Sequence, residues 1–152
     1  VDSYFYNDFK MKKYIFYSYA ETQKFAESFS QNINPGQIVA LIGDLGSGKT
    51  TFSQGFARGL GIEEKVISPT FKLVSEYYSQ KSLFHIDCYR LKNVNEFLII
   101  GGEEILSKKD AIVLIEWPER IKSMWSDDWV YISFKMNKQE PSIREVIIEG
   151  FK

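Results

Sequence analysis

The fold is decided by a stretch in the first third of the chain, which reads Gly43-Asp44-Leu45-Gly46-Ser47-Gly48-Lys49-Thr50-Thr51. Its first eight residues match G-x-x-x-x-G-K-[ST], the pattern of a phosphate-binding loop. Glycines let the backbone turn tightly, so that successive N–H groups can surround a polyphosphate. Lys49 supplies a mobile positive charge for the β and γ phosphates, and the Thr50 hydroxyl is a ligand for Mg²⁺. The stretch therefore predicts that residues 43–51 bind the phosphates of a nucleotide together with Mg²⁺.

The residues on either side provide the context that such a loop needs. Residues 37–42 form a nearly continuous apolar run, typical of a strand buried on both faces. Residues 49–60 are predicted to be a helix that ends at Gly61, and the positive end of its dipole would face the phosphates. A Rossmann-type dinucleotide turn is excluded, because G-x-G-x-x-G has no place for Lys49.

The rest of the chain alternates between predicted strands and helices. Ser18 and Glu21 match a capping box at the start of a helix that runs to about residue 32. Further strands are expected at 14–17, 72–78, 82–88, 111–115, 129–136 and 144–149, with helical pieces between 95 and 106. The last two strands form a C-terminal antiparallel hairpin. These elements predict an α/β fold, a P-loop NTPase-like three-layer sandwich with a mixed, partly parallel sheet.

The length of 152 residues fits one domain. We expect a single P-loop ATPase domain over residues 11–152. Met11 is interpreted as the natural start, so residues 1–10 are set aside from the fold as an upstream extension or an artificial remnant. No run approaches the ~18 apolar residues that a membrane span needs, which argues against a membrane partner.

Composition excludes several other classes of function. Lys and Arg number 19 against 20 Asp and Glu, and the net charge of -1 excludes binding to nucleic acid through bulk positive charge. Cys88 is the single cysteine and His85 the single histidine, which excludes an internal disulfide framework and metal centres built from several cysteines or histidines. One free cysteine fits the reducing cytosol, so a cytoplasmic location is expected.

Hydrolysis of a nucleotide needs a carboxylate that holds Mg²⁺ or orients water, and two acids end apolar strands. Glu116 directly follows the apolar run 111–115, so it should emerge beside the phosphate loop at the carboxyl edge of the sheet. Asp87 ends a second such strand. Thr70 could sense a γ phosphate as switch threonines do. For Glu116, Asp87 and Thr70, an ordinary structural role is the alternative. His85 taken alone is interpreted as a hydrogen-bonded sheet residue.

Four blocks taken together resemble the bacterial TsaE (YjeE) ATPases. These blocks are the loop 43–51, Ser68-Pro69-Thr70-Phe71, His85-Ile86-Asp87-Cys88-Tyr89-Arg90-Leu91 and Glu116-Trp117-Pro118-Glu119. The resemblance runs from about residue 21 to residue 144. Ser47 stands where the family usually has Ala, and Cys88 where Leu is usual. Neither change removes a side chain with an assigned role.

The resemblance implies a function in the biosynthesis of threonylcarbamoyladenosine, a modification of tRNA. TsaE-like proteins bind ATP and Mg²⁺ and work with TsaB and TsaD, so TsaB- and TsaD-like partners are expected, and contact with tRNA only indirectly through that complex. By position, Lys49 and Thr50 would hold phosphate and Mg²⁺, Glu116 would be a metal-associated acid, and Asp87 and Thr70 would support hydrolysis. Hydrolysis is expected to be weak without the partners.

Three alternatives remain open at this point. A small-molecule P-loop kinase shares the loop but usually has an arginine-rich lid, and the four arginines, Arg58, Arg90, Arg120 and Arg144, are spread along the chain. A GTPase switch is disfavoured because no N-K-x-D segment occurs. A nucleotide-gated interaction module with vestigial hydrolysis is the third. Tyr19 and Arg144 are guesses for residues that contact the base.

Overall fold

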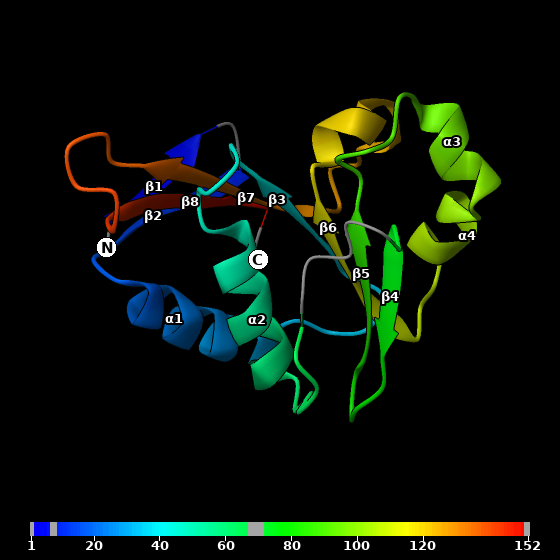
Figure 1. Ribbon diagram of the computed structural model, residues 1–152, viewed down its shortest axis with the longest axis horizontal. Coiled ribbons are helices and arrows are strands. Elements are labelled where there is room, and N and C mark those ends of the chain that lie inside the picture. Colours follow the sequence, from blue (N-terminus) through cyan, green and yellow to red (C-terminus); the bar gives the residue numbers. More distant parts are fainter. Residues whose placement is uncertain (1, 7–8, 67–71, 151–152) are drawn as a thin grey trace.

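The computed structural model of the chain describes residues 2–6, 9–66 and 72–150. Its strands form one sheet with the order β1-β2-β8-β7-β3-β6-β5-β4 (Figure 1). The strands are β1 (Asp2–Tyr6), β2 (Phe9–Phe16), β3 (Ile38–Ile42), β4 (Val74–Tyr77), β5 (Ser82–Asp87), β6 (Ala111–Glu116), β7 (Val130–Met136) and β8 (Arg144–Glu149). Strands β7, β3, β6 and β5 are mutually parallel, and every other pairing is antiparallel. The predicted mixed sheet and the β7–β8 hairpin are confirmed.

Helices lie on both faces of this sheet, which confirms the three-layer architecture (Figure 1). The helices are α1 (Tyr19–Gln31), α2 (Lys49–Gly59), α3 (Val94–Ile99), α4 (Gly102–Leu106) and the 3₁₀ helix η1 (Pro118–Met124). Side chains of α1 and α2, such as Phe29 and Phe52, pack with Leu41 and Leu114 of the sheet. On the opposite face, Phe97 and Ile121 pack with the alternate residues of the same strands. No described helix is long and apolar enough to cross a membrane.

The burial of each strand follows its hydrophobic pattern. Every residue of β6 and all but the last residue of β3 are buried, as the continuous apolar runs predict for strands covered on both faces. In contrast, β7 and the hairpin partner β8 alternate between buried and partly exposed residues. The continuous runs therefore mark the centre of the sheet, where the loop between β3 and α2 leaves the core.

Helices α1 and α2 run parallel and approach each other closely. Gln23 Nε2 donates to Gln54 Oε1 at 2.9 Å, and Arg58 pairs with Glu27 at 2.9 Å. In both contacts the α2 residue lies 31 positions after its α1 partner, as expected for parallel helices. A Cβ on Gly55 or Gly59 would collide with the α1 backbone. The lack of a side chain at these two positions permits the close packing. The first turns of both helices consequently lie at the same end of the pair.

The start of α1 is fixed by the predicted capping box. The Ser18 hydroxyl accepts from the Glu21 amide at 3.1 Å, and the Glu21 carboxylate accepts from the Tyr17 amide at 2.7 Å. These two bonds satisfy backbone donors that have no partner within the helix. As a result, Tyr19 is the first residue of α1.

The N-terminal strands differ from the prediction. Residues 1–10 were predicted to lie outside the fold and the first strand to span 14–17, but residues 2–6 form β1 and residues 9–16 form β2. Strand β2 pairs antiparallel with β8, and β1 extends the sheet by one more strand. The reason for the error is that Lys10, Lys12 and Lys13 interrupt the apolar pattern. Backbone pairing with β8 defines this strand more than its hydrophobicity does.

Candidate nucleotide-binding site

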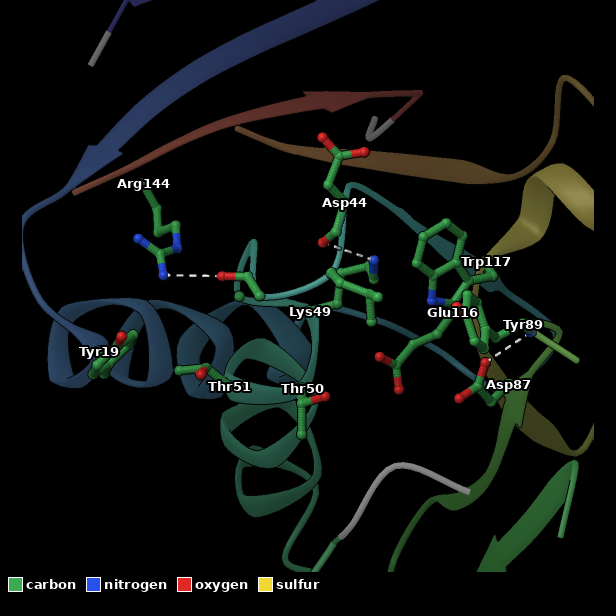
Figure 2. A pocket seen from close by; sticks show the side chains of 13 residues that line it. Tyr19, Asp44, Lys49, Thr50, Thr51, Asp87, Tyr89, Glu116, Trp117 and Arg144 are labelled. Carbon is green, nitrogen blue, oxygen red and sulfur yellow. Dashed lines mark hydrogen bonds between the residues drawn. The ribbon is translucent and has the colours of Figure 1, made fainter. Parts of the chain in front are cut away.

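A pocket of about 380 Å³ lies where the loop after β3 meets the carboxyl ends of β5 and β6. Figure 2 shows Asp87, Glu116 and Trp117 at one end, Lys49, Thr50 and Thr51 between, and Tyr19 and Arg144 at the other end. The lining residues are Tyr19, Asp44, Leu45, Gly46, Gly48, Lys49, Thr50, Thr51, Asp87, Tyr89, Glu116, Trp117 and Arg144. This is the crevice outside the carboxyl ends of parallel strands, the usual ligand position in such sheets.

The glycine-rich loop forms the floor of the pocket. Gly46 and Gly48 have φ values of +76° and +110°, in the region that favours glycine. Helix α2 begins directly after Gly48, so its unpaired backbone amides face the pocket. Of the predicted loop residues, Gly43 and Ser47 do not line the pocket. Ser47 is buried, and its Oγ lies 2.5 Å from where a Cβ on Gly43 would be.

Lys49 lies across this loop with its ammonium group nearly buried. Its Nζ donates to the Gly43 carbonyl and, at 3.2 Å, to the Asp44 carbonyl. It also lies 4.0 Å from the centre of the Trp117 ring. Burial lowers the pKa of Lys49, while the nearby carboxylates, Glu116 foremost, oppose this effect. The charge is thus surrounded by backbone oxygens, an aromatic face and acids, all of which favour a cation in the pocket.

Thr50 and Thr51 occupy the first turn of α2, and both line the pocket (Figure 2). Their place follows directly from the sequence, because the helix begins at Lys49 and turns its first residues toward the crevice. The Thr50 hydroxyl is on the side of the carboxylates, whereas Thr51 lies toward Tyr19. Thr50 and Thr51, both predicted to bind the nucleotide, therefore lie in the pocket.

The two predicted acids are brought together by the register of β5 and β6. Asp87 and Glu116 are Cα partners at the ends of these parallel strands, and Glu116 is also the partner of Leu41 at the end of β3. They are only 6% and 2% exposed. Asp87 Oδ1 accepts from the Tyr89 amide at 2.9 Å. Both carboxylates therefore line the same end of the pocket, where Glu116 was predicted to emerge and where Asp87 was predicted to end a second such strand.

His85 is the buried partner of Glu116. Its Nε2 lies 2.6 Å from Glu116 Oε2, and neither side chain is accessible to solvent beyond a few per cent. Because a carboxylate oxygen accepts, we assign the ring proton to Nε2. Within the described residues, the buried Nδ1 has no hydrogen-bond partner. The prediction of a hydrogen-bonded sheet histidine is correct, but its partner is a pocket carboxylate, which the sequence alone did not indicate.

Two aromatic residues complete the acidic end of the pocket. Trp117 has a φ of +57°, a conformation that is rare for a bulky side chain and marks local strain. Its ring lies against Tyr89, with centroids 4.9 Å apart, and covers Lys49. Neither Trp117 nor Tyr89 was predicted to be a site residue. The signal available was their position, since Trp117 directly follows Glu116 and Tyr89 lies two residues after Asp87.

The guessed base contacts Tyr19 and Arg144 also line the pocket, at its far end. The Arg144 guanidinium lies 5.5 Å from the centre of the Tyr19 ring and donates through Nη2 to the Gly46 carbonyl at 3.1 Å. Thr70, predicted to support hydrolysis, lies outside the described residues. Among the predicted catalytic residues, the structure thus places Asp87 and Glu116 in the pocket.

The donor atoms at the acidic end fit a magnesium ion bound together with phosphate. Mg²⁺ in phosphate sites is held by one or two carboxylates and by the phosphates rather than by a cage of protein ligands. The Thr50 hydroxyl and the carboxylates of Glu116 and Asp87 are oxygen donors that line one pocket. No cluster of three or more His, Cys, Asp or Glu side chains suited to a metal occurs in the described part of the chain. A metal here would therefore need the ligand's own oxygens.

Comparison with known proteins agrees with this geometry. Residues 16–146 match the family model described as threonylcarbamoyl adenosine biosynthesis protein TsaE. The TsaE proteins of Borreliella burgdorferi and Treponema pallidum are 40% and 36% identical, covering 74% and 76% of this chain and 82% and 85% of theirs. The TsaE protein of Bacillus subtilis is 38% identical, covering 76% of this chain and 72% of its own.

A solved structure shares the same architecture. The crystal structure of Bacillus subtilis YdiB superposes with a TM-score of 0.75 and 29% sequence identity. The alignment covers 93% of this chain and 86% of that one, so the likeness includes both the parallel centre of the sheet and the antiparallel strands beside it. With the family model matching most of the chain and several relatives above one third identity, the protein belongs to the TsaE family.

Proposed function

We propose that the chain is a cytoplasmic, Mg²⁺-dependent ATP-binding and ATP-hydrolysing subunit that serves threonylcarbamoyladenosine modification of tRNA. Membership of the TsaE family supports the assignment to this modification, because the relatives carry that function in their names. The observation that carries the ATPase assignment is the single pocket that contains Lys49, Thr50, Asp87 and Glu116. A cation, a hydroxyl and two buried carboxylates around a glycine-rich loop are the groups that phosphoryl transfer to water requires.

Each of these residues has a distinct role in the proposed reaction. The amides of the loop and of the first turn of α2 bind the phosphates, and Lys49 turns its ammonium from the loop carbonyls toward the β and γ phosphates. Thr50 and Glu116 would hold Mg²⁺, which would supply positive charge to the phosphate oxygens. Asp87 orients the attacking water. The water oxygen bonds to the γ phosphorus, the bond to the β–γ bridging oxygen breaks, and ADP and phosphate leave.

Arginine placement supports slow turnover by the isolated protein. Of the described residues that line the pocket, Arg144 is the one arginine, and it lies at the end away from the carboxylates. An arginine on the transferred phosphate is worth about 10³–10⁵ in rate. We propose that TsaB- and TsaD-like partners complete or order the site, and that tRNA is contacted only through this complex. Thr70 stays a predicted element of that response.

A coupled measurement of binding and hydrolysis tests this function. Affinity for a TsaB–TsaD assembly is measured with ADP and with a non-hydrolysable ATP analogue, and ADP release is measured with and without the assembly. We expect tighter binding with the ATP analogue and faster hydrolysis with the assembly. By linkage, the partners then tighten binding of the analogue by the same factor. Equal affinities together with an unchanged rate would contradict the proposal and leave an autonomous phosphotransfer enzyme as the better interpretation.

A further inference from the structure

The connection between α3 and α4 exposes three apolar side chains in a row. Leu98, Ile99 and Ile100 are 39%, 83% and 38% exposed. We call residues 98–100 the apolar turn. Single exposed apolar residues are common on proteins, but a contiguous group marks a surface that another molecule covers. The apolar turn therefore indicates an interaction surface.

The residues on either side hold the apolar turn in a fixed shape. Phe97 is fully buried, and its ring occupies the space that a Cβ on Gly102 would need. Gly101 has a φ of +82°, in the region that favours glycine. Phe97 thus anchors the connection in the core, while the three residues after it are left outside. Their exposure is a property of the folded chain rather than of a loose segment.

The border of the apolar turn is acidic. Glu103 and Glu104 lie in the first turn of α4, directly after the connection, and both are exposed. Among the described residues, neither carboxylate forms a salt bridge. A molecule that covers this surface should therefore offer an apolar hollow with positive charge at its edge.

The face of the sheet that carries α3 is uncovered at its other end. Phe97 packs on this face over β3, β5 and β6, and in the described part of the chain no residue of β2 or β8 belongs to that cluster. Strand alternation places Lys135 on the same face as Tyr131, which does pack against the cluster. Lys135 is the cross-strand partner of Glu145, and Glu145 is that of Ile15. These three side chains therefore lie on the uncovered end of the face.

A cavity of about 360 Å³ lies at this uncovered end, beside the connection between β7 and β8. Its apolar lining comes from Ile15, Met136 and Ile143. Ile15 and Met136 are 49% and 41% exposed, so the hollow is open to solvent. We call it the sheet cavity. Its apolar lining matches the side chains of the apolar turn.

The edge of the sheet cavity is positively charged. Lys135 and Lys138 line it, both are exposed, and neither forms a salt bridge with a described residue. Glu145 also lines it, but its carboxylate pairs with Lys13. The two lysines are therefore opposite in charge to the carboxylates of the first turn of α4. The sheet cavity and the apolar turn are complementary in both polarity and charge.

We propose that two copies of this chain pair about a two-fold axis, with the apolar turn of each copy in the sheet cavity of the other. Figure 1 shows α3 at one end of the molecule and the orange connection between β7 and β8 at the other. A single turn in a single cavity is a small contact, but a two-fold arrangement buries both turns and both cavities at once. No such surface is then left to add a third copy.

A second copy is favoured over a different protein because both halves of the contact are present on this chain. The described lining of the nucleotide pocket includes no residue of the apolar turn or of the sheet cavity. The inference therefore does not depend on the proposed ATPase function, and substitutions in the contact should leave nucleotide binding unchanged.

Sedimentation velocity of the full chain from about 5 to about 500 µM measures the association. The wild type should change from monomer to dimer over this range and form nothing larger. Ile99→Ser should weaken dimerisation at least about tenfold, because the most exposed side chain of the apolar turn is lost. Tyr78→Ser is the matched control, since Tyr78 is 72% exposed but belongs to neither surface. It should dimerise as the wild type does.

Charge reversal tests whether these two surfaces are partners. One variant carries Glu103→Lys and Glu104→Lys, and the other carries Lys135→Glu and Lys138→Glu. Each variant alone places like charges at both contacts of its dimer and should stay monomeric. In an equimolar mixture, a mixed dimer has opposite charges at both contacts, so dimerisation should return to within a few-fold of the wild type.

The other outcomes overturn the proposal. A wild type that stays monomeric at the highest concentration would exclude self-association, and normal dimers of Ile99→Ser would exclude the apolar turn. Species larger than a dimer would exclude the two-fold arrangement. Charge-reversed variants that stay apart when mixed would exclude the sheet cavity as the counterpart. If the chain is monomeric and Ile99→Ser weakens binding to a TsaB–TsaD assembly, the apolar turn docks on a different protein.

Discussion

The two ends of the pocket are built in different ways. At the acidic end, Asp87 and Glu116 end adjacent parallel strands, are almost fully buried, and are each held by a further hydrogen bond. At the other end, Tyr19 begins a helix and its ring is largely exposed. The acidic end is part of the core of the sheet, whereas the Tyr19 end is part of the surface.

This difference indicates how each end contributes to function. Groups that act on a reacting atom must be held within a fraction of an ångström, and burial between strands provides that precision. A stacking surface needs only a flat ring in the right place. We therefore expect substitutions at the acidic end to change the rate of hydrolysis, and substitutions at the Tyr19 end to change affinity. The following predictions test this division.

The largest effect is expected for the two acids. Glu116→Gln and Asp87→Asn should each lower the rate of ATP hydrolysis by about 10²-fold or more, because a carboxylate that positions water or metal is lost while the shape is kept. Nucleotide affinity should fall much less. Single-turnover hydrolysis and calorimetry on the same preparations measure the two quantities. A variant that keeps the full rate would remove its residue from the catalytic set, with Asp87 as the weaker candidate on sequence grounds.

The next effect concerns the middle of the pocket. Lys49→Ala should weaken ATP binding by about 10- to 100-fold, the value of a charge-assisted hydrogen bond or two. Thr50→Ala should weaken binding measurably only when Mg²⁺ is present, because its hydroxyl is assigned to the metal. Titration of a fluorescent ATP analogue with and without Mg²⁺ measures both. Equal losses for Thr50→Ala in the two conditions would contradict its role as a metal ligand.

A smaller effect is expected for His85, which acts through Glu116. His85→Leu leaves the buried carboxylate without its partner and should lower the free energy of unfolding by about 1–3 kcal/mol. His85→Gln keeps an N–H donor and should recover part of that loss together with part of the hydrolysis rate. Urea unfolding and steady-state hydrolysis provide the measurements. Full activity in a stably folded His85→Leu protein would show that Glu116 needs no orientation by His85.

The smallest expected effect is a change in the alkylation rate of Cys88, which follows Asp87 and reports on opening of the acidic end. Burial raises the pKa of this thiol from 9.0 to about 12. At pH 8 the folded protein therefore carries almost no thiolate, and alkylation should follow opening of the strand end. The raised pKa also stabilises the fold fully below about pH 8.5, an advantage that is lost as the pH rises toward 12.

The alkylation rate of Cys88 should respond to substitutions at only one end of the pocket. Tyr19→Ala should leave the alkylation rate of Cys88 within about twofold of the wild type, while His85→Leu should raise it, since only the second change lies in the core. Mass spectrometry of iodoacetamide-treated protein at pH 8 measures both rates. Faster alkylation in Tyr19→Ala would mean that the two ends are not structurally independent.

Sequence reasoning succeeded where a pattern is local. The loop 43–51, the buried strands β3 and β6 and the bounds of β8 each follow from residues adjacent in the chain. It failed where pairing between distant segments decides the outcome. The His85–Glu116 contact depends on the register of β5 and β6, which neither segment specifies alone. For the same reason, β1 was not predicted and only the end of β2 was.

The lack of a side chain at Gly55 and Gly59 has a consequence for the width of the pocket. The backbones of α1 and α2 are in contact at these two glycines, which lie about one to two helical turns beyond Thr51. This contact sets the distance between Tyr19 and Thr51. Even one extra methyl group at either glycine would force the helices apart and widen the pocket. The width of the pocket is thus set partly by two positions that do not line it.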